Sequence, residues 1–130
     1  MNNPTNMTDE MIADEIANDP TQFLMEWNSM SSKAHANSRD KGFWDNPQDP
    51  AVSIALMHSE LSEALEALRK PHLEGHLYEK GHTLLEEEMA DVVIRIMDFS
   101  RAHRLNVGAA IVAKMRYNRG REKMHGDKKF

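Results

Sequence analysis

Apolar residues recur along most of the chain at spacings of three and four, the pattern of helices with one buried face. Strict alternation of apolar and polar residues, which is typical of half-buried strands, is missing. Only 6 glycines and 5 prolines interrupt the 130 residues. The pattern therefore predicts an all-α fold, a bundle of four to five helices.

Residues that favour the first turn of a helix mark where each predicted segment begins. Asp19-Pro20 and Asp49-Pro50 each place a capping aspartate before a proline, and Thr83 with Glu86 forms a capping box. Thr8 and Asn106 are the other predicted caps. The predicted helices run over residues 8–18, 19–37, 49–69, 83–103 and 107–123.

Two of these helices carry long apolar stripes that we expect to be buried. The second predicted helix has its stripe at Phe23, Trp27, Met30 and Ala34. On the third, Leu56, Ala64 and Ala67 form a second apolar strip, which predicts burial on two sides. Its main stripe consists of Ile54, Met57, Leu61, Leu65 and Leu68.

Pairs of acidic residues lie one helical turn apart on consecutive predicted helices. Glu60 and Glu63 share one face of the third helix, and Glu88 and Asp91 share one face of the fourth. On a helical wheel Glu88 falls about 40° from Val92, inside the apolar sector of its helix. Because an unpaired buried carboxylate is very costly, we expect a cation nearby.

Two kinds of cation satisfy this requirement. Four carboxylates on facing helices suit Mg²⁺ or Mn²⁺, which prefer oxygen ligands and keep waters for a substrate. The alternative is an ion pair between Glu88 and Arg95. The sequence contains no cysteine, which excludes disulfides and thiolate sites.

The net charge of −5 is unevenly distributed, with nine acids and three bases over residues 60–91 and seven bases and two acids over 114–130. An acidic centre with a basic tail suits a metal-bound polyphosphate, although two solvated faces would give the same pattern. Near the tail, Lys114, Asn118 and Arg121 continue an apolar stripe, where a lysine and an arginine are suitable partners of phosphate oxygens. The alternative is that these long side chains reach from a core edge to solvent.

Several other kinds of protein fit less well. A ferritin-type di-iron site needs Glu-x-x-His pairs on core helices, and the two such pairs here lie in a connector and in the tail. Phosphate-binding GxxxxGK loops, GxSxG elbows and zinc motifs are absent. The negative net charge argues against nucleic acid as a partner, and no apolar run is long enough for a membrane span, so we expect a cytoplasmic protein.

Four segments in order resemble MazG-like nucleotide pyrophosphohydrolases of the all-α NTP pyrophosphatase superfamily, in their compact phage or gene-cassette form. The segments are KGFWD, HSELSEALEALRK, EEEMADVVIRIMDF and KMRYNRGREKMHGDKKF. The resemblance covers residues 23–130, and the connector at 69–82 and the amino-terminal arm do not match it. It implies an arm or short helix at 1–19 and a helical catalytic domain at 20–130.

The resemblance also implies an activity, Mg²⁺-dependent hydrolysis of a (deoxy)nucleoside triphosphate to the monophosphate and pyrophosphate, with Mn²⁺ as a possible substitute. A homodimer or homotetramer is implied as well, acting in the cytoplasm, and dGTP, GTP or another purine nucleotide is a candidate substrate. The implied metal ligands are Glu60, Glu63, Glu88 and Asp91. The implied phosphate-binding residues are Lys114, Asn118, Arg121 and Lys128.

The remaining roles are assigned from the residues themselves. Glu63, ahead of Glu60, is the candidate to activate water. The loop aromatics Trp44 and Phe43 are candidates to stack on the base because they lie outside any apolar stripe, and the alternative for Trp44 is packing across a subunit interface. Two alternatives stay open: a non-catalytic helical partner-binding module with a structural ion-pair network, and an enzyme like the phosphoribosyl-ATP pyrophosphatases.

Overall fold

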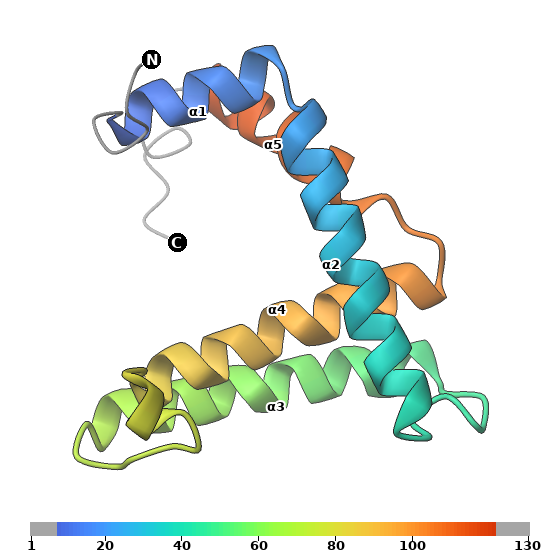
Figure 1. Ribbon diagram of the computed structural model, residues 1–130, viewed down its shortest axis with the longest axis vertical. Helices are drawn as coiled ribbons and strands as arrows, with labels where there is room; N and C mark the ends of the chain where they lie inside the picture. Colours follow the sequence, from blue (N-terminus) through green and yellow to red (C-terminus); the bar gives the residue numbers. More distant parts are fainter. Residues whose placement is uncertain (1–7, 122–130) are drawn as a thin grey trace. The chain divides into compact units, whose positions relative to one another are not determined.

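The computed structural model describes residues 8–121, which form five α-helices and no strand (Figure 1). The prediction of an all-α chain is therefore confirmed over this range. None of these helices is long and apolar enough to cross a membrane. The helices are α1 (Asp9–Asn18), α2 (Thr21–Asp40), α3 (Pro50–Arg69), α4 (Leu84–Ala102) and α5 (Val107–Arg119), with a 3₁₀ turn at Tyr78–Lys80.

The helix starts follow the predicted capping residues. The side chain of Thr8 accepts a hydrogen bond from the Met11 N–H, and Asp49 accepts one from Ala51 N–H at 2.8 Å. At the start of α4 both halves of the capping box are formed by Thr83 and Glu86. These contacts satisfy backbone donors that a helix leaves free in its first turn, which explains why short polar residues fix the boundaries.

Two helix ends differ from the prediction. α2 continues three residues into the predicted loop and ends at Asp40, where Gly42 takes a positive φ of 85° and its N–H bonds to the Arg39 carbonyl. A glycine in this conformation is a common stop signal after a helix, and it stands five residues later than the predicted end. α5 ends at Arg119, and the predicted end at residue 123 lies outside the described residues.

The chain divides into two compact units, one made of Met1–Ser29 and Asn106–Phe130 and the other of Met30–Leu105, so that α2 contributes to both. In the first unit α1 packs on α5, and Arg119 forms an ion pair with Asp14. A Cβ atom on Gly108 would lie 2.8 Å from Cδ1 of Trp27, so the glycine allows α5 to approach this ring closely. Trp27 thus packs inside this unit.

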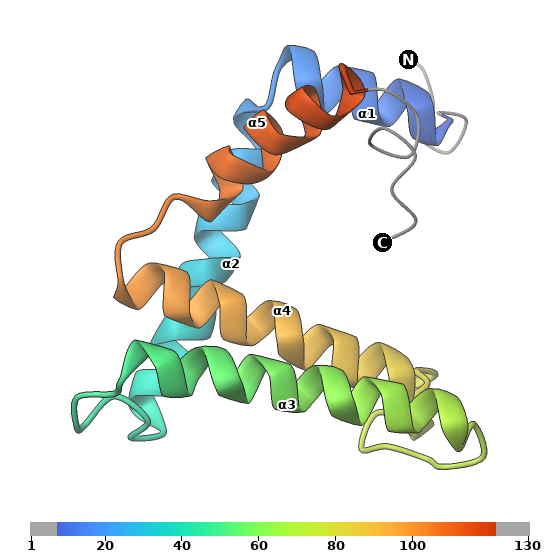
Figure 2. The same ribbon diagram turned by 180° about the vertical axis from the view of Figure 1, so that it is seen from behind.

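The second unit is built on an antiparallel hairpin of α3 and α4, which lie side by side along their length (Figures 1 and 2). The connector 70–83 joins them at one end. Ala64 and Ala67 of α3 are buried, as are Val92 and Met97 of α4. Two small residues on α3 let the helices approach closely, and this contact forms the core of the unit.

The expectation that the main stripe of α3 is buried is wrong for the described residues. Ile54, Leu61, Leu65 and Leu68 are between 42% and 61% exposed, and only Met57 of the stripe is half-buried. α4 packs on the alanines of the second strip and beside Glu60, whereas Leu56, the third member of that strip, is 41% exposed. Met30, predicted in the stripe of α2, is exposed as well.

Candidate metal centre

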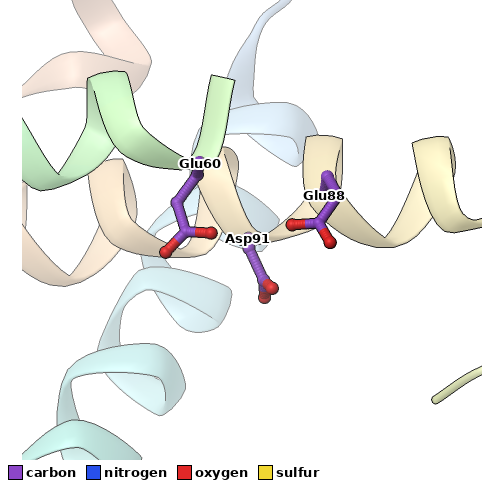
Figure 3. Close-up of side chains that lie close together, drawn as sticks. All are labelled: Glu60, Glu88 and Asp91. Atoms are coloured by element: carbon purple, nitrogen blue, oxygen red, sulfur yellow. The ribbon is translucent and has the colours of Figure 1, made fainter. Parts of the chain in front are cut away.

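The hairpin brings three of the four predicted carboxylates together. Glu60 comes from the middle of α3, and Glu88 and Asp91 come from the first half of α4, which runs in the opposite direction. Each of the three offers an oxygen that lies within 4.8 Å of the oxygens of the other two (Figure 3). The two-helix arrangement expected from the paired i, i+3 spacing is therefore present in this unit.

The cluster runs from the core to the surface. Glu60 is 8% exposed and lies in the strip of α3 that packs on α4, Glu88 is half-buried, and Asp91 is exposed. A carboxylate as buried as Glu60 needs a compensating charge, and an exposed neighbour such as Asp91 leaves the group accessible from solvent. Solvent exposure thus increases from Glu60 to Asp91, an arrangement that gives an ion access to the cluster from the side of Asp91.

Arg95 compensates Glu60 and not Glu88. The Nε of Arg95 donates to Oε1 of Glu60 at 2.6 Å, although the arginine side chain is itself 42% exposed. The alternative of a Glu88–Arg95 ion pair on one helix is thus replaced by an ion pair between helices. The pair engages one oxygen of Glu60, and a carboxylate carries a second oxygen that can accept further contacts.

The electrostatics of the cluster show that one arginine does not balance it. Burial and then the charges of Glu63, Asp91 and Glu60 raise the pKa of Glu88 above its ordinary value of 4.5. Burial and the charge of Glu60 raise the pKa of Asp91 above 3.8, against a smaller opposite effect of Arg95 and His76. Like charges at close range disfavour the ionised form, and a cation would remove this penalty.

Glu63 lies beside the cluster and outside the group of three. Its side chain is exposed, and a hydrogen bond with Glu60, followed by the charge of Glu60, raises its pKa above 4.5. Three oxygen donors within 4.8 Å suit a hard divalent cation such as Mg²⁺, which commonly takes few protein carboxylates and keeps several waters. The donor set therefore fits the predicted metal, with Glu63 at its edge.

The phosphate-binding candidates lie on α5, in the other compact unit. Lys114 and Asn118 are exposed, and the ammonium of Lys114 lies 4.7 Å from the centre of the Tyr117 ring. The guanidinium of Arg121 lies 5.6 Å from the same ring centre, so both cations interact with the Tyr117 ring. Lys128 falls outside the described residues, and all four roles stay predictions.

Trp44 has a packing role that the sequence did not predict. Its indole N–H donates to Asp98 at 2.9 Å and to the Ser38 hydroxyl at 3.1 Å, and its ring contacts His35 and His103 edge-on. Trp44 therefore contributes to packing within the chain, contrary to the expectation for a loop aromatic outside any apolar stripe. Its neighbour Phe43 is 64% exposed. Base binding by either residue stays a prediction.

Three polar residues near these groups were not singled out from the sequence. Nδ1 of His35 lies 2.7 Å from Oδ1 of Asp98, which joins α2 to α4, and Glu87 accepts a hydrogen bond from the Leu77 N–H at 3.1 Å. Asp98 follows Asp91 by seven residues, about two helical turns, and thus lies near the same face of α4. This spacing is the signal in the sequence that identifies Asp98 as a candidate. The connector residue Leu77 and the distant His35 gave no such signal.

Hollows in the described part of this unit include a large one and a small one. One of about 580 Å³ lies between the end of α3, the connector and the start of α4, and Leu68, Tyr78, His82 and Leu84 are among its lining residues. The other is a cleft of about 40 Å³ beside Trp44, Arg95 and Asp98. The smaller has room for about one water molecule, because a water occupies about 30 Å³ of liquid volume.

Comparison of the chain with protein-family models, curated proteins and solved structures gave no match. The resemblance to MazG-like enzymes thus rests on the four sequence segments that carry it. The geometry of the acidic cluster is an observation independent of that resemblance.

Proposed function

We propose that the chain is a Mg²⁺-dependent nucleoside triphosphate pyrophosphohydrolase of MazG-like type. The observation that carries the proposal is the cluster of Glu60, Glu88 and Asp91, three carboxylates from two helices with oxygens within 4.8 Å of one another. The raised pKa values of Glu88 and Asp91 add support, since the cluster is short of positive charge without a metal ion. Mn²⁺ is expected to substitute for Mg²⁺.

In this proposal the three carboxylates hold the metal, and Glu63 accepts a proton. Bound Mg²⁺ would neutralise phosphate charge and lower the pKa of water. Glu63 is the better base because it is exposed and its raised pKa favours taking a proton, whereas one oxygen of Glu60 is engaged by Arg95. Water attacks the α-phosphorus, its proton passes to Glu63, and the bond to the bridging oxygen of the β-phosphate breaks, which releases pyrophosphate.

The first experiment identifies the products. The purified chain is incubated with each NTP and dNTP, purine nucleotides included, in Mg²⁺ or Mn²⁺, and the products are separated by chromatography. Monophosphate and pyrophosphate are expected for at least one nucleotide. Stepwise release of orthophosphate through a diphosphate would contradict the proposed cleavage position.

A partner-binding module is a second candidate function, and the Arg95–Glu60 ion pair favours it. At 2.6 Å this pair already gives the most buried carboxylate a counter-charge, so the cluster could be a structural network. The module would release no pyrophosphate at any metal concentration. Adding phosphoribosyl-ATP to the substrate panel tests the third possibility, an enzyme of the phosphoribosyl-ATP pyrophosphatase kind.

A further inference from the structure

The larger hollow, of about 580 Å³, lies at the end of the hairpin where the connector joins α3 to α4 (Figure 1). Most of the residues that line it are apolar. Leu68, Leu73 and Tyr78 are each more than two-fifths exposed, so large apolar side chains border the hollow without being covered by the described chain. Hollows of this size and lining are the usual binding sites of small organic molecules.

The connector wall of the hollow is held in place at two points. Glu87 of α4 accepts a hydrogen bond from the Leu77 N–H at 3.1 Å, and the same carboxylate leaves no room for a Cβ atom at Gly75. Gly81 takes a positive φ of 87°, and its N–H bonds to the Tyr78 carbonyl at 3.0 Å. Glycine adopts this conformation readily, whereas a residue with a Cβ atom is strained there. The hollow is therefore formed by the chain itself before any ligand binds.

The helical walls of the hollow continue the two faces that carry the acidic cluster. On α4, Leu84 stands seven residues before Asp91, about two helical turns along the same face. On α3, Ala67 stands seven residues after Glu60 in the same way. Leu84 precedes Glu88 by four residues, a rise of about 6 Å along the helix. One small molecule is therefore long enough to reach both the hollow and the cluster.

The hollow and the cluster call for opposite chemistry in such a molecule. An apolar lining favours an uncharged ring system, and three carboxylates with a cation favour oxygen ligands such as phosphates. A nucleoside triphosphate has this form, because a sugar separates its aromatic base from its phosphates. Tyr78 supplies a ring on which a base can stack, and Glu79 and His82 supply polar groups that orient it.

The cleft beside Trp44, the other aromatic candidate for the base in this unit, is much smaller. Its volume of about 40 Å³ has room for about one water molecule. The indole N–H of Trp44 is also engaged by Asp98 and Ser38. Within the described chain a base therefore fits the hollow and does not fit this cleft.

We propose that the hollow at the connector end of the hairpin is the subsite for the base of the nucleotide, and that the base is a purine. Two fused rings cover more of the apolar lining than one ring does, and removing apolar surface from water is what favours binding there. The inference rests on the proposed function for its ligand, since the phosphates bound at the cluster place the base within reach of the hollow.

The first test uses nucleosides, which carry the base without phosphates and need no metal ion. Deoxyadenosine, deoxyinosine, deoxycytidine and thymidine are titrated into the full chain in a chelator, and NMR follows the methyl groups of Leu73 and Leu84. The two purine nucleosides are expected to shift these signals, to leave the Trp44 indole signal unchanged, and to bind more tightly than the two pyrimidine nucleosides. Shifts confined to Trp44, tighter binding of the pyrimidines, or no shift with any nucleoside would overturn the proposal.

Variants of the lining test the site without changing the acidic cluster. Leu84→Trp fills the hollow and Tyr78→Ala removes a ring from it, and each is expected to weaken purine nucleoside binding about fivefold or more, the order of a lost base–aromatic stack. Tyr78→Phe keeps the ring and should bind as wild type does. Val52→Trp is the control for an added ring, because Val52 is an exposed apolar residue at the other end of α3. Wild-type affinity in both Leu84→Trp and Tyr78→Ala would overturn the proposal.

Hydrolysis kinetics separate this inference from the proposed function. In Mg²⁺, Leu84→Trp is expected to raise KM for purine triphosphates and to keep the wild-type rise of the melting temperature with Mg²⁺, because the carboxylates of the cluster are unchanged. If wild type hydrolyses no nucleotide but purine nucleosides still shift Leu73 and Leu84, the proposed function is wrong and the hollow remains a nucleoside site. If wild type releases pyrophosphate and Leu84→Trp keeps the wild-type KM for purines, the hollow is not the base subsite and the proposed function stands.

Discussion

The two long sides of α3 differ in a way that reverses the usual order of burial. On the side that meets α4, the buried residues are small or charged, namely Ala64, Ala67 and Glu60. About 100° further round the helix, Leu61 and Leu65 remain close to half exposed. The same helix therefore buries a carboxylate and leaves its largest apolar side chains in contact with solvent.

The difference in burial between the two sides of α3 follows from the small residues that pack on α4. Alanine against α4 brings the two helices close enough for Glu60 to join Glu88 and Asp91 in one cluster, at the expense of apolar burial there. Burying a leucine fully stabilises a protein by about 1.5–3 kcal/mol, so the exposed side holds most of the apolar burial that α3 can still gain. The packed side builds the candidate site, and the exposed side keeps apolar surface that the described residues leave uncovered.

The largest effect that can test this division is expected from Glu88→Gln. The substitution keeps the shape of the side chain and removes the charge that would hold Mg²⁺. Pyrophosphate release is expected to fall by at least about 100-fold, the order seen when a site loses charge stabilisation of its transition state. Glu66→Gln, a surface carboxylate of α3 that pairs with Lys70, is the control and should retain activity.

Thermal melts of the same proteins separate a metal site from a structural network. Mg²⁺ is expected to raise the melting temperature of wild type and of Glu66→Gln, because binding to the native state alone stabilises it, and to have no effect on Glu88→Gln. Without metal, Glu88→Gln should be as stable as wild type or more so, since it relieves repulsion among the acids. A wild-type melt insensitive to Mg²⁺, together with a destabilised variant, would contradict the metal-site interpretation.

A second prediction compares the two sides of α3 by packing alone. Ala64 is 4% exposed against α4, so Ala64→Leu is expected to destabilise the protein by roughly 1–3 kcal/mol through overpacking. Leu65→Ala, on the exposed side, should cost less than this in dilute protein. The measurement is urea unfolding of both variants at the same low protein concentration. A larger loss from Leu65→Ala would mean that the exposed stripe of α3 is already covered within one chain.

The sequence predicted local features of this molecule better than its packing. Capping residues such as Thr83 act on the nearest backbone groups, so the starts of α3 and α4 followed directly from them. The pattern predicted burial of both apolar strips on α3, whereas only the alanines of the second strip are buried, because burial depends on which helices pack against each strip. Trp44 was misjudged for the same reason, because its partner Asp98 lies 54 residues away.

The candidate site was predictable to the extent that it depends on spacing along one helix. The i, i+3 pairs placed Glu88 and Asp91 on one face of α4, and the position of Glu88 in an apolar sector indicated that its charge matters. The partner of Arg95 was not predictable in this way, since the choice between Glu88 and Glu60 depends on how far apart the two helices lie.

The smallest predicted effect is a pH dependence whose sign differs between Glu88 and the surface carboxylate Glu66. Without metal the native protein binds a proton at Glu88 more tightly than the unfolded chain does, because the pKa of Glu88 is raised above 4.5. Stability from this group is thus full below about pH 4.5 and falls as the pH rises through the raised value. Glu66 behaves oppositely, since Lys70 lowers its pKa, so its contribution is present above about pH 4.5 and is lost as the pH falls.

Urea unfolding of wild type, Glu88→Gln and Glu66→Gln from about pH 4 to about pH 7 in a chelator isolates the two contributions as differences from wild type. The free energy of unfolding of wild type relative to Glu88→Gln should fall with rising pH, and that of wild type relative to Glu66→Gln should rise. Saturating Mg²⁺ should reverse the trend at Glu88 alone, because the cation competes with protons for the cluster and favours its ionised form. If the difference in free energy of unfolding between wild type and Glu88→Gln does not change with pH in chelator, the acids of α3 and α4 are too well solvated to repel one another. The acidic cluster on the packed side of α3 would then need no metal ion to balance its charge.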